Sequence, residues 1–300
     1  MNEASRHRLG VLLVAGAAVW WSTGGLFIRS VHTDPWTTIF WRSVSAAATM
    51  FLFLAIRKRA GVFAHFRKIG WPGVIIALCF CGASTCYIPA VLLTSVANAL
   101  ILQSTSPFLA ALFAFLLMGE RIDLRTLITM LVSIFGVYVM VATSLSGGSL
   151  LGNGLGLAIG VFYAFAVVVT RHSRAIQMLP ASCLAAVFAA VLSFSILFIT
   201  QHRFPWPIAL PDLAWLSAFG GLQMAGGMVM FTYGVRMIPA AEGALLSIIE
   251  AVAAPIWVFV FFSEDPGIRA IVGGYIVLAA VTIYAAFDLR RNDPIVPTPS

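Results

Sequence analysis

The sequence predicts an all-α polytopic membrane protein with ten transmembrane helices, arranged as two inverted five-helix repeats. Three observations lead to this fold class. The chain is rich in apolar residues and poor in charge, it divides into long apolar runs separated by short polar joints, and its basic residues collect in alternate joints. The few polar groups that interrupt the apolar runs are therefore the candidate functional residues.

The composition excludes a water-soluble globular domain. Such domains carry about 45–50% apolar and about 25% charged residues, whereas this chain of 300 residues is 61% hydrophobic and 10% charged, with a mean hydropathy of +0.99. A disordered chain is excluded because disorder requires low hydrophobicity. A membrane helix needs about 20 apolar residues in a row, whereas a barrel strand needs about 10 that alternate. The runs here are long and unbroken, which indicates helices.

Ten apolar runs are long enough to be read as membrane spans, and short joints with turn residues such as Asp34-Pro35 separate them. Together they use about two thirds of the chain, so no room is left for a soluble catalytic domain. The expected spans are Leu9–Ile28, Thr37–Ile56, Trp71–Leu93, Ala97–Met118, Leu124–Val141, Leu151–Thr170, Pro180–Thr200, Leu213–Tyr233, Ala240–Phe262 and Ala270–Phe287.

The basic residues fix the expected orientation. Fourteen of the 18 Lys and Arg residues fall in the N-terminal segment and the even-numbered joints, against three in the odd-numbered joints. Because cytoplasmic loops carry the excess of basic residues, a multi-pass protein of the plasma (inner) membrane with both termini cytoplasmic is predicted. The net charge of +7 is then a topology signal, not a nucleic-acid signal. The stretch Arg57–Lys68 is expected to lie on the inner leaflet as an interfacial segment.

The two halves of the chain show weak internal similarity. A shift of 144 residues aligns Trp71–Ala142 with Trp215–Ala286, and it pairs Glu120 with Glu264. Five spans per half is an odd number, so related halves must lie upside down relative to each other, as in many secondary transporters. The expected domains are a first repeat at 1–146, a second repeat at 147–287 and a disordered cytoplasmic tail at 288–300.

Several motifs carry a family resemblance. Ala97-Asn98-Ala99 is followed by Ser106-Pro107 and by Gly119-Glu120-Arg121 at the end of the fourth span. With these motifs the chain resembles the drug/metabolite transporters of the EamA type, and overall it also resembles their aromatic amino-acid exporter branch. The second half departs from the family pattern, because Glu250 is followed by Ala251 where the family often has proline. The resemblance implies a central substrate site enclosed by spans one, three, four, six, eight and nine.

Three ionisable residues lie well inside the spans, namely Arg42, Glu242 and Glu250. Such groups are costly in a bilayer and are functional candidates by default. Glu250 is expected to bind an amino group, to carry a coupling proton, or both; the alternative is a structural carboxylate satisfied by a neighbouring hydroxyl or amide. Glu242 is a second candidate for gating or proton coupling, although a solvated interfacial carboxylate is the simpler interpretation. Arg42 either snorkels to the outer surface, pairs with a carboxylate or lines an external vestibule.

Polar and aromatic residues on the other spans complete the expected site. Glu250 shares a helix face with Ser247, and the repeat partner of that face carries Gln103 and Ser106. Two such faces would form opposite walls of one cavity; the alternative is a close helix–helix contact. The further candidate substrate-binding residues, which could also be simple packing residues, are Asn98, Tyr87, Gln223, Trp21 and Tyr163.

The expected function is export of small metabolites by alternating access, with amino acids, aromatic ones included, as the substrates. A broad exporter of hydrophobic cations is the alternative within the same class, because Glu250 and the aromatic residues would serve it too. A membrane-embedded lipid enzyme is a remote alternative, since the sequence contains no paired carboxylates, His cluster or metal-ligand spacing. The expected partners are a small-molecule substrate and the lipid bilayer, with no nucleic acid, metal or cofactor; the sequence does not predict an oligomeric state.

Overall fold

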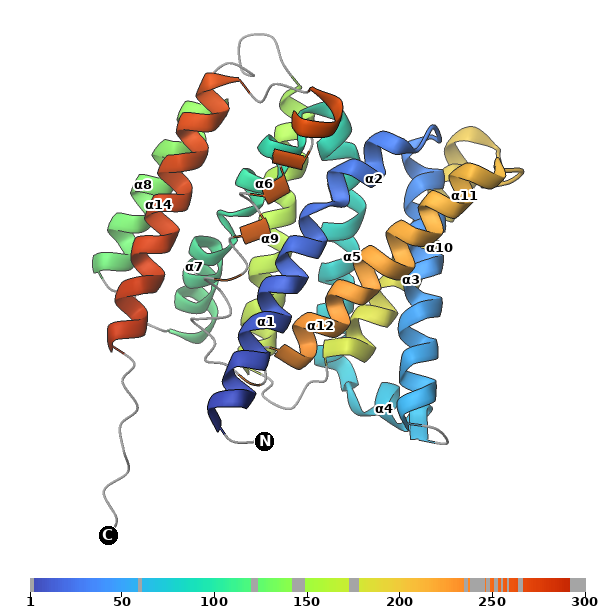
Figure 1. Cartoon of the computed structure of the whole chain (residues 1–300), viewed down its shortest axis with the longest axis horizontal. Coiled ribbons are helices and arrows are strands. Elements are labelled where there is room, and N and C mark those ends of the chain that lie inside the picture. The colour runs from blue at the N-terminus through green and yellow to red at the C-terminus, as the bar shows by residue number, and fades with distance from the viewer. Residues whose placement is uncertain are drawn as a thin grey trace.

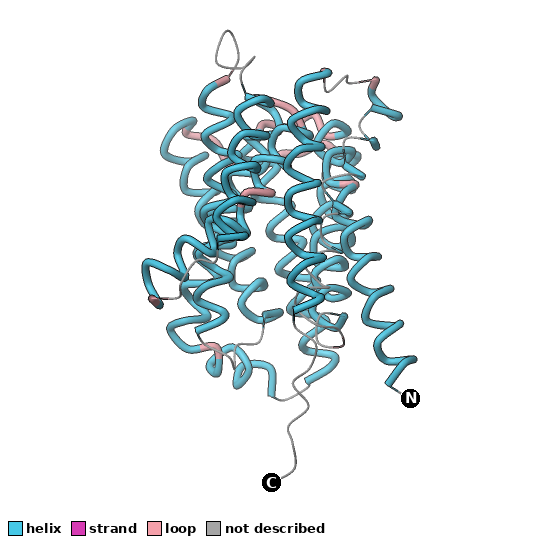
Figure 2. Tube along the Cα trace, turned by 90° about the vertical axis from the view of Figure 1, so that its left-hand side faces the viewer, coloured by secondary structure: helices cyan, strands magenta, loops and turns pink. Residues whose placement is uncertain are grey.

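A computed structural model describes residues 3–58, 61–119, 124–141, 149–172, 178–234, 237, 246, 249–250, 253–254, 256–257, 259–263 and 267–291. This part of the chain is helical and contains no strand (Figures 1 and 2). The helices are α1 (Glu3–Ser22), α2 (Gly24–Ser30), α3 (Pro35–Lys58), α4 (Val62–Lys68), α5 (Gly70–Leu93), α6 (Val96–Gln103), α7 (Ser106–Met118), α8 (Leu124–Val141), α9 (Leu150–His172), α10 (Met178–Gln201), α11 (Leu210–Ser217), η3 (Ala218–Gly226), α12 (Gly227–Gly234) and α14 (Ile268–Arg291). The described residues from 246 to 262 are also helical and are called the 246–262 segment.

Six helical stretches of the described chain are long and apolar enough to cross a membrane. They overlap expected spans one, two, three, six, seven and eight, and they are Ser5–Ser30, Pro35–Arg57, Gly70–Leu93, Leu150–Thr170, Met178–Gln201 and Leu210–Gly234. Expected spans four, five and ten coincide with α6–α7, α8 and α14, whose apolar stretches are shorter. The ninth expected span falls largely outside the described residues. The all-helical class is therefore confirmed for the described residues, with six candidate membrane spans, and the arrangement of ten spans as two inverted repeats stays a prediction.

Two of the expected spans, the first and the fourth, are interrupted, and the eighth changes its winding. The first breaks at Thr23, just before the pair Gly24-Gly25, and Thr23 Oγ1 turns back to donate to the Trp20 carbonyl at 2.7 Å. The fourth breaks between α6 and α7, where Pro107 occupies the first turn of α7. Proline is well tolerated there because its missing amide donor would have no partner in the helix. The eighth contains the wide π-helical stretch η3, a form often found at functional sites.

Contacts between helices of the two halves come in matching pairs: each has a counterpart made by the corresponding spans of the opposite halves. α5 packs along α9 and α12 along α1, while α3 packs on η3 and α10 on α5. α8 packs against α14, and α3 against α10. A glycine allows α8 and α14 to approach closely, since a Cβ added at Gly136 of α8 would lie 3.0 Å from the Gly273 carbonyl oxygen of α14. The start of α1, the end of α14 and α4 all lie at the lower end of the molecule in Figure 1.

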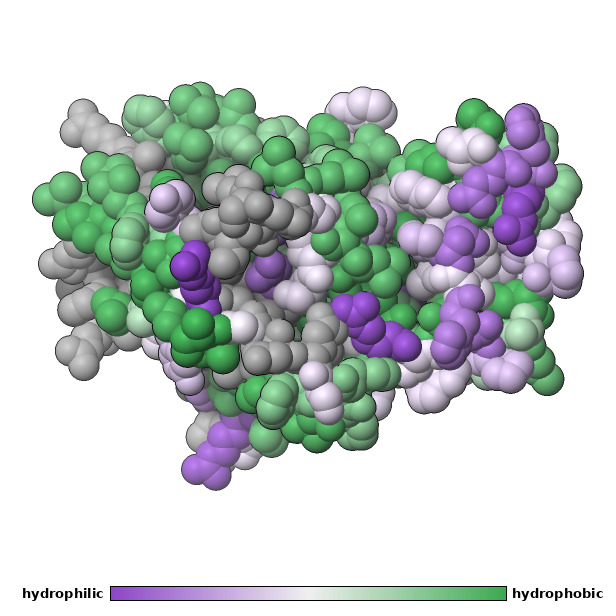
Figure 3. Space-filling model, turned by 90° about the horizontal axis from the view of Figure 1, so that it is seen from above, coloured by the Kyte–Doolittle hydropathy of each residue, from purple (hydrophilic) through white to green (hydrophobic). Residues whose placement is uncertain are grey.

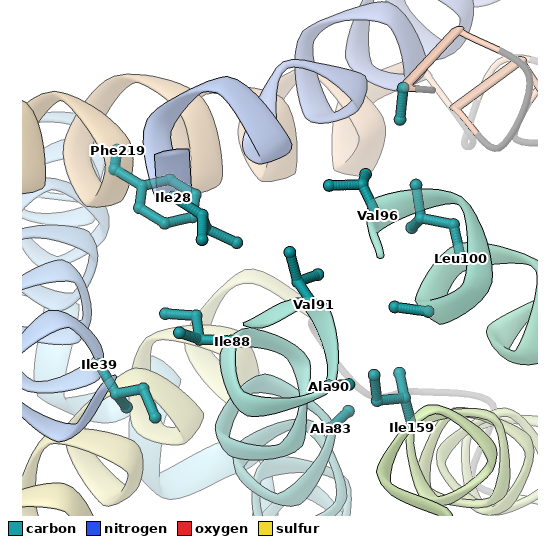
Figure 4. Packing of buried hydrophobic residues seen from close by; sticks show 12 residues of the cluster. Ile28, Ile39, Ala83, Ile88, Ala90, Val91, Val96, Leu100, Ile159 and Phe219 are labelled. Atoms are coloured by element: carbon teal, nitrogen blue, oxygen red, sulfur yellow. The ribbon is translucent and has the colours of Figure 1, made fainter. Parts of the chain in front are cut away.

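The core is built from small and branched apolar side chains where the helices converge. One buried cluster joins α2, α3, α5, α6, α9 and η3 through residues that include Ile28, Ile88 and Phe219, and Ala254 of the 246–262 segment belongs to it (Figure 4). Apolar side chains cover much of the perimeter, whereas hydrophilic ones gather above the α2–α3 and α10–α11 connections (Figure 3). On α4 the Phe63 side chain is 77% exposed, which fits the expected interfacial segment.

Candidate functional site

Glu250 lies deep in the protein, on the 246–262 segment. Protein atoms surround its carboxylate, yet part of its surface stays accessible. Two neighbours on the same segment fix its place. Ala254 is buried in the cluster that contains Val96 of α6, and Trp257 donates from Nε1 to Ser22 Oγ at the end of α1, at 2.9 Å. The segment that carries Glu250 thus shares a buried cluster with α6 and is hydrogen-bonded to the end of α1.

Two tyrosines from different helices interact with this carboxylate. Tyr87 of α5 and Tyr163 of α9 both lie deep in the protein, and each interacts electrostatically with Glu250. Both keep some accessible surface, as Glu250 does. The Tyr163 ring is supported edge-on by Phe80, with 5.6 Å between ring centroids. The structure therefore brings together three of the expected site residues, from α5, α9 and the 246–262 segment.

Gly24 makes room for the polar groups beside the first helix break. A Cβ added at Gly24 would lie 3.2 Å from the Tyr87 hydroxyl and 3.1 Å from the Gln223 side-chain nitrogen. Gln223 of η3 is 5% exposed and donates from Nε2 to the Trp21 carbonyl at 2.8 Å. That carbonyl belongs to the last turn of α1, where the helix itself provides no donor. Gln223 thus caps the break and lies next to Tyr87.

Trp21 has a packing role in the arrangement described here. Its indole Nε1 donates to the Met224 carbonyl at 3.4 Å, and its ring lies 5.4 Å from that of Phe231. A Cβ added at Gly227 would lie only 2.2 Å from Trp21 Nε1. The side chain therefore fills the contact between α1 and α12, and its role in substrate binding stays a prediction.

Arg42 does not snorkel to the outer surface, so that interpretation of the sequence is wrong. The residue is 4% exposed, and its Nη2 donates to the Ser84 carbonyl at 3.1 Å and to Ser84 Oγ. Its guanidinium carbon lies 5.1 Å from the centre of the Phe219 ring. Arg42 also interacts electrostatically with Tyr87 and Tyr163. The hydrogen bonds to α5 and the ring of η3 together turn the side chain inwards.

The candidates on the fourth span lie at or near its break. Asn98, Gln103 and Ser106 are all partly buried, on α6 or at the start of α7. Both helices pack against α9, the helix that carries Tyr163. Among the described residues no hydrogen bond joins these three side chains to Glu250, so their role stays a prediction. Ser247 and Glu242 lie outside the described residues.

Two features of the site were missed from the sequence. The break in the fourth span comes just before Ser106-Pro107, and this pair is a sequence signal for it because proline favours the first turn of a helix. One sequence signal could have indicated the inward orientation of Arg42, because Ser84, a hydrogen-bonding residue, lies at a similar depth on the neighbouring span. No sequence signal indicated that the Phe219 ring lies against Arg42, because Phe219 belongs to a helix far away in the sequence.

The described part of the chain has no group of three His, Cys, Asp or Glu side chains that could hold a metal ion. The four cysteines are free and are buried or half-buried within helices. Cys183 packs with Ala46 and Met50 in a cluster between α3 and α10. The polar groups of the site are one carboxylate, one guanidinium, two phenols and one amide. This combination suits recognition of a polar organic molecule.

Comparison with known proteins places the chain among transporters. The model of the EamA-like transporter family matches it twice, at residues 8–142 and 150–286. An uncharacterised transporter of Archaeoglobus fulgidus is 26% identical over 92% of this chain and 96% of its own length. The pseudopaline exporter CntI of Pseudomonas aeruginosa is 28% identical over 90% of this chain and 94% of its own. A crystal structure superposes with a TM-score of 0.64 at 19% identity, covering 94% of this chain and 99% of the other, a likeness that concerns the fold alone.

Proposed function

Because the chain belongs to the EamA-like transporter family and is a multi-pass membrane transport protein, not an enzyme, we propose that it exports small metabolites. The proposed substrates are amino acids, aromatic ones included. The observation that carries this proposal is the meeting of Glu250, Tyr87 and Tyr163. They come from helices of both family matches, and each combines a deep position with accessible surface. A carboxylate beside aromatic hydroxyls offers an ammonium group a charge partner and an aromatic side chain a stacking surface.

The proposed mechanism is alternating access around this site. In the proposal the ten spans form two inverted repeats, and their rocking opens the site to each side in turn. Two observations support the repeats: the family model matches each half separately, and the helix pairs α5–α9 and α3–η3 have the counterparts α12–α1 and α10–α5. The breaks at Thr23 and between α6 and α7 place irregular backbone inside two expected spans, which a bilayer tolerates only inside protein or beside a cavity.

Export from the cytoplasm is the proposed direction. It is supported by the similarity to a relative named as a pseudopaline exporter. The proposed location is the plasma (inner) membrane with both termini cytoplasmic, supported by the bias of basic residues toward one set of joints. The start of α1, the end of α14 and the basic helix α4 also share one end of the molecule (Figure 1).

The experiment that tests this function is transport in proteoliposomes. The purified protein is reconstituted, and uptake is measured for a labelled panel of amino acids, hydrophobic cations and nucleotides. We expect saturable uptake of amino acids, with the aromatic ones included. Uptake of hydrophobic cations without any amino acid would replace the proposal with broad cation efflux. A protein-free liposome preparation provides the background rate.

A further inference from the structure

Arg42 is a buried cation without a carboxylate partner in the described part of the chain. It is 4% exposed, and none of the ion pairs found among described residues includes it. Its hydrogen bonds go to the neutral atoms of Ser84. Removing a charge from water is expensive unless an opposite charge compensates it. A buried guanidinium held only by a serine and an aromatic ring is therefore available for an anion.

The side chain of Arg42 is held in one orientation. Ser84 of α5 accepts both hydrogen bonds from Nη2, and the Phe219 ring lies against the guanidinium. The backbone is fixed as well, since a Cβ added at Gly220 would lie 1.9 Å from the Arg42 carbonyl oxygen. Nε has no hydrogen-bond partner. Because Nη2 already donates twice to Ser84 and Nε is buried, the oriented guanidinium offers an anion a fixed, uncompensated positive charge, with which carboxylates pair well.

Glu250 provides the opposite charge, but it is not the direct partner of Arg42. No ion pair joins the two residues, and instead each of Tyr87 and Tyr163 interacts electrostatically with both. The two phenols thus each interact with both a buried cation and a buried carboxylate. Both tyrosines keep some accessible surface, so they are the part of this group of charged and polar side chains that a small molecule can contact.

We infer that Arg42 binds the carboxylate of the transported molecule while Glu250 binds its amino group. The substrate class is then a zwitterion whose two charges span the Tyr87–Tyr163 pair. A hydrophobic amine without a carboxylate would leave Arg42 uncompensated and would bind more weakly. This assignment rests on the proposed transport function, and it adds the residue that separates amino acids from amine cations.

The test is equilibrium binding to the purified full chain in detergent, with three probes that differ only in their charges. They are phenylalanine, 2-phenylethylamine, which lacks the carboxylate, and 3-phenylpropionate, which lacks the amine. The wild type is expected to bind phenylalanine most tightly. Arg42→Gln is expected to weaken phenylalanine binding about 10- to 100-fold, as for loss of hydrogen bonds to a charged group. It is expected to change phenylethylamine binding by less than about threefold.

Two further variants keep the test decisive if Arg42→Gln folds poorly. Arg42→Lys keeps the charge and should recover part of the phenylalanine affinity. Ser84→Ala keeps the guanidinium but removes its anchor, and it should selectively weaken the two probes that carry a carboxylate. The matched control is Arg57→Gln, because Arg57 also lies over aromatic rings, Phe53 and Tyr233, but is exposed at the end of α3.

Two results would overturn the assignment. One is an Arg42→Gln protein that binds phenylalanine as the wild type does. The other is equal loss of phenylalanine and phenylethylamine in a folded variant, which would indicate a structural role. Failure of the proposed function looks different, because then the wild type itself neither binds nor transports any amino acid.

Discussion

Trp257 donates a hydrogen bond from Nε1 to Ser22 Oγ at 2.9 Å, and it thereby joins the segment that carries Glu250 to the break between α1 and α2. The Ser22 hydroxyl in turn donates to the Val19 carbonyl at 2.6 Å, so it is used as both acceptor and donor. Ser22 is 1% exposed, and its hydroxyl therefore has no water to replace a lost partner. The bond links the first and the ninth expected spans beside the candidate site.

Replacing both partners of this bond should reveal coupling between them. Trp257→Phe and Ser22→Ala are each expected to lower stability, and the double variant should lose less than their sum by about 0.5–1.5 kcal/mol. Thermal or denaturant unfolding of the four proteins in detergent measures this. The control cycle pairs Ser22→Ala with Trp71→Phe, because Trp71 is 73% exposed at the start of α5. Strictly additive effects at Ser22 and Trp257 would argue against the bond.

Gly220→Ala should destabilise the contact between η3 and α3. The added methyl group would overlap the Arg42 carbonyl oxygen, 1.9 Å away, and backbone atoms cannot move aside cheaply. We expect a loss of about 1–3 kcal/mol, seen as a lower melting temperature. Gly154→Ala in α9 is the control, because nothing lies within 4 Å of its added Cβ. That change should be neutral or stabilising; equal melting temperatures for the two variants would contradict the described packing.

Loss of the tyrosine hydroxyls should weaken substrate binding without unfolding the protein. Tyr87→Phe and Tyr163→Phe keep the rings but remove the groups that interact with Glu250 and Arg42. Each is expected to raise the KM for transport about 2- to 10-fold, the usual effect of one hydrogen bond. Tyr138→Phe and Tyr275→Phe are matched controls at 62% and 72% exposure on α8 and α14. Kinetics indistinguishable from these controls would remove the phenols from the site.

The orientation in the membrane can be tested by labelling single cysteines. His202→Cys lies in the exposed α10–α11 connection, and Phe63→Cys on α4, where Phe63 is 77% exposed. An impermeant maleimide should label the first in intact cells and the second only after permeabilisation, because the proposed topology places the basic helix α4 on the cytoplasmic side. The native chain, whose cysteines are buried or half-buried, provides the background. The reverse labelling pattern would invert the proposed topology.

The helical membrane architecture could be predicted from the sequence because it depends on the length and composition of apolar runs. Which residues within a span are buried was harder to predict, because hydropathy indicates that a residue lies in the membrane but not which neighbours it faces. Arg42 illustrates this, since its inward direction depends on Ser84 and Phe219 from other helices. Helix windings such as η3 depend on tertiary contacts, including the fit of Gly220 against α3.

The site was predictable where a polar residue was rare and central. Glu250 stood out as a carboxylate near the middle of an apolar run, and Tyr87 and Tyr163 do lie with it. Trp21 was as conspicuous, but its ring is used in the α1–α12 contact. Aromatic residues serve packing and binding equally well, so residue type alone cannot separate these roles. The binding and coupling roles of all the candidate residues, with Gln103, Ser106, Ser247 and Glu242 among them, remain predictions.

The most direct test of the central claim is counterflow of labelled phenylalanine in proteoliposomes that contain Glu250→Gln, measured with and without a pH gradient. Because the amide cannot replace the charge of the carboxylate, the initial rate should fall at least about tenfold. Asp212→Asn is the matched control for replacing a carboxylate by an amide. Asp212 lies at the start of α11 and accepts a hydrogen bond at 3.3 Å from the backbone amide of His32, in the α2–α3 connection. The account predicts loss for Glu250→Gln and wild-type rates for Asp212→Asn. Unchanged transport by Glu250→Gln under both conditions would contradict it.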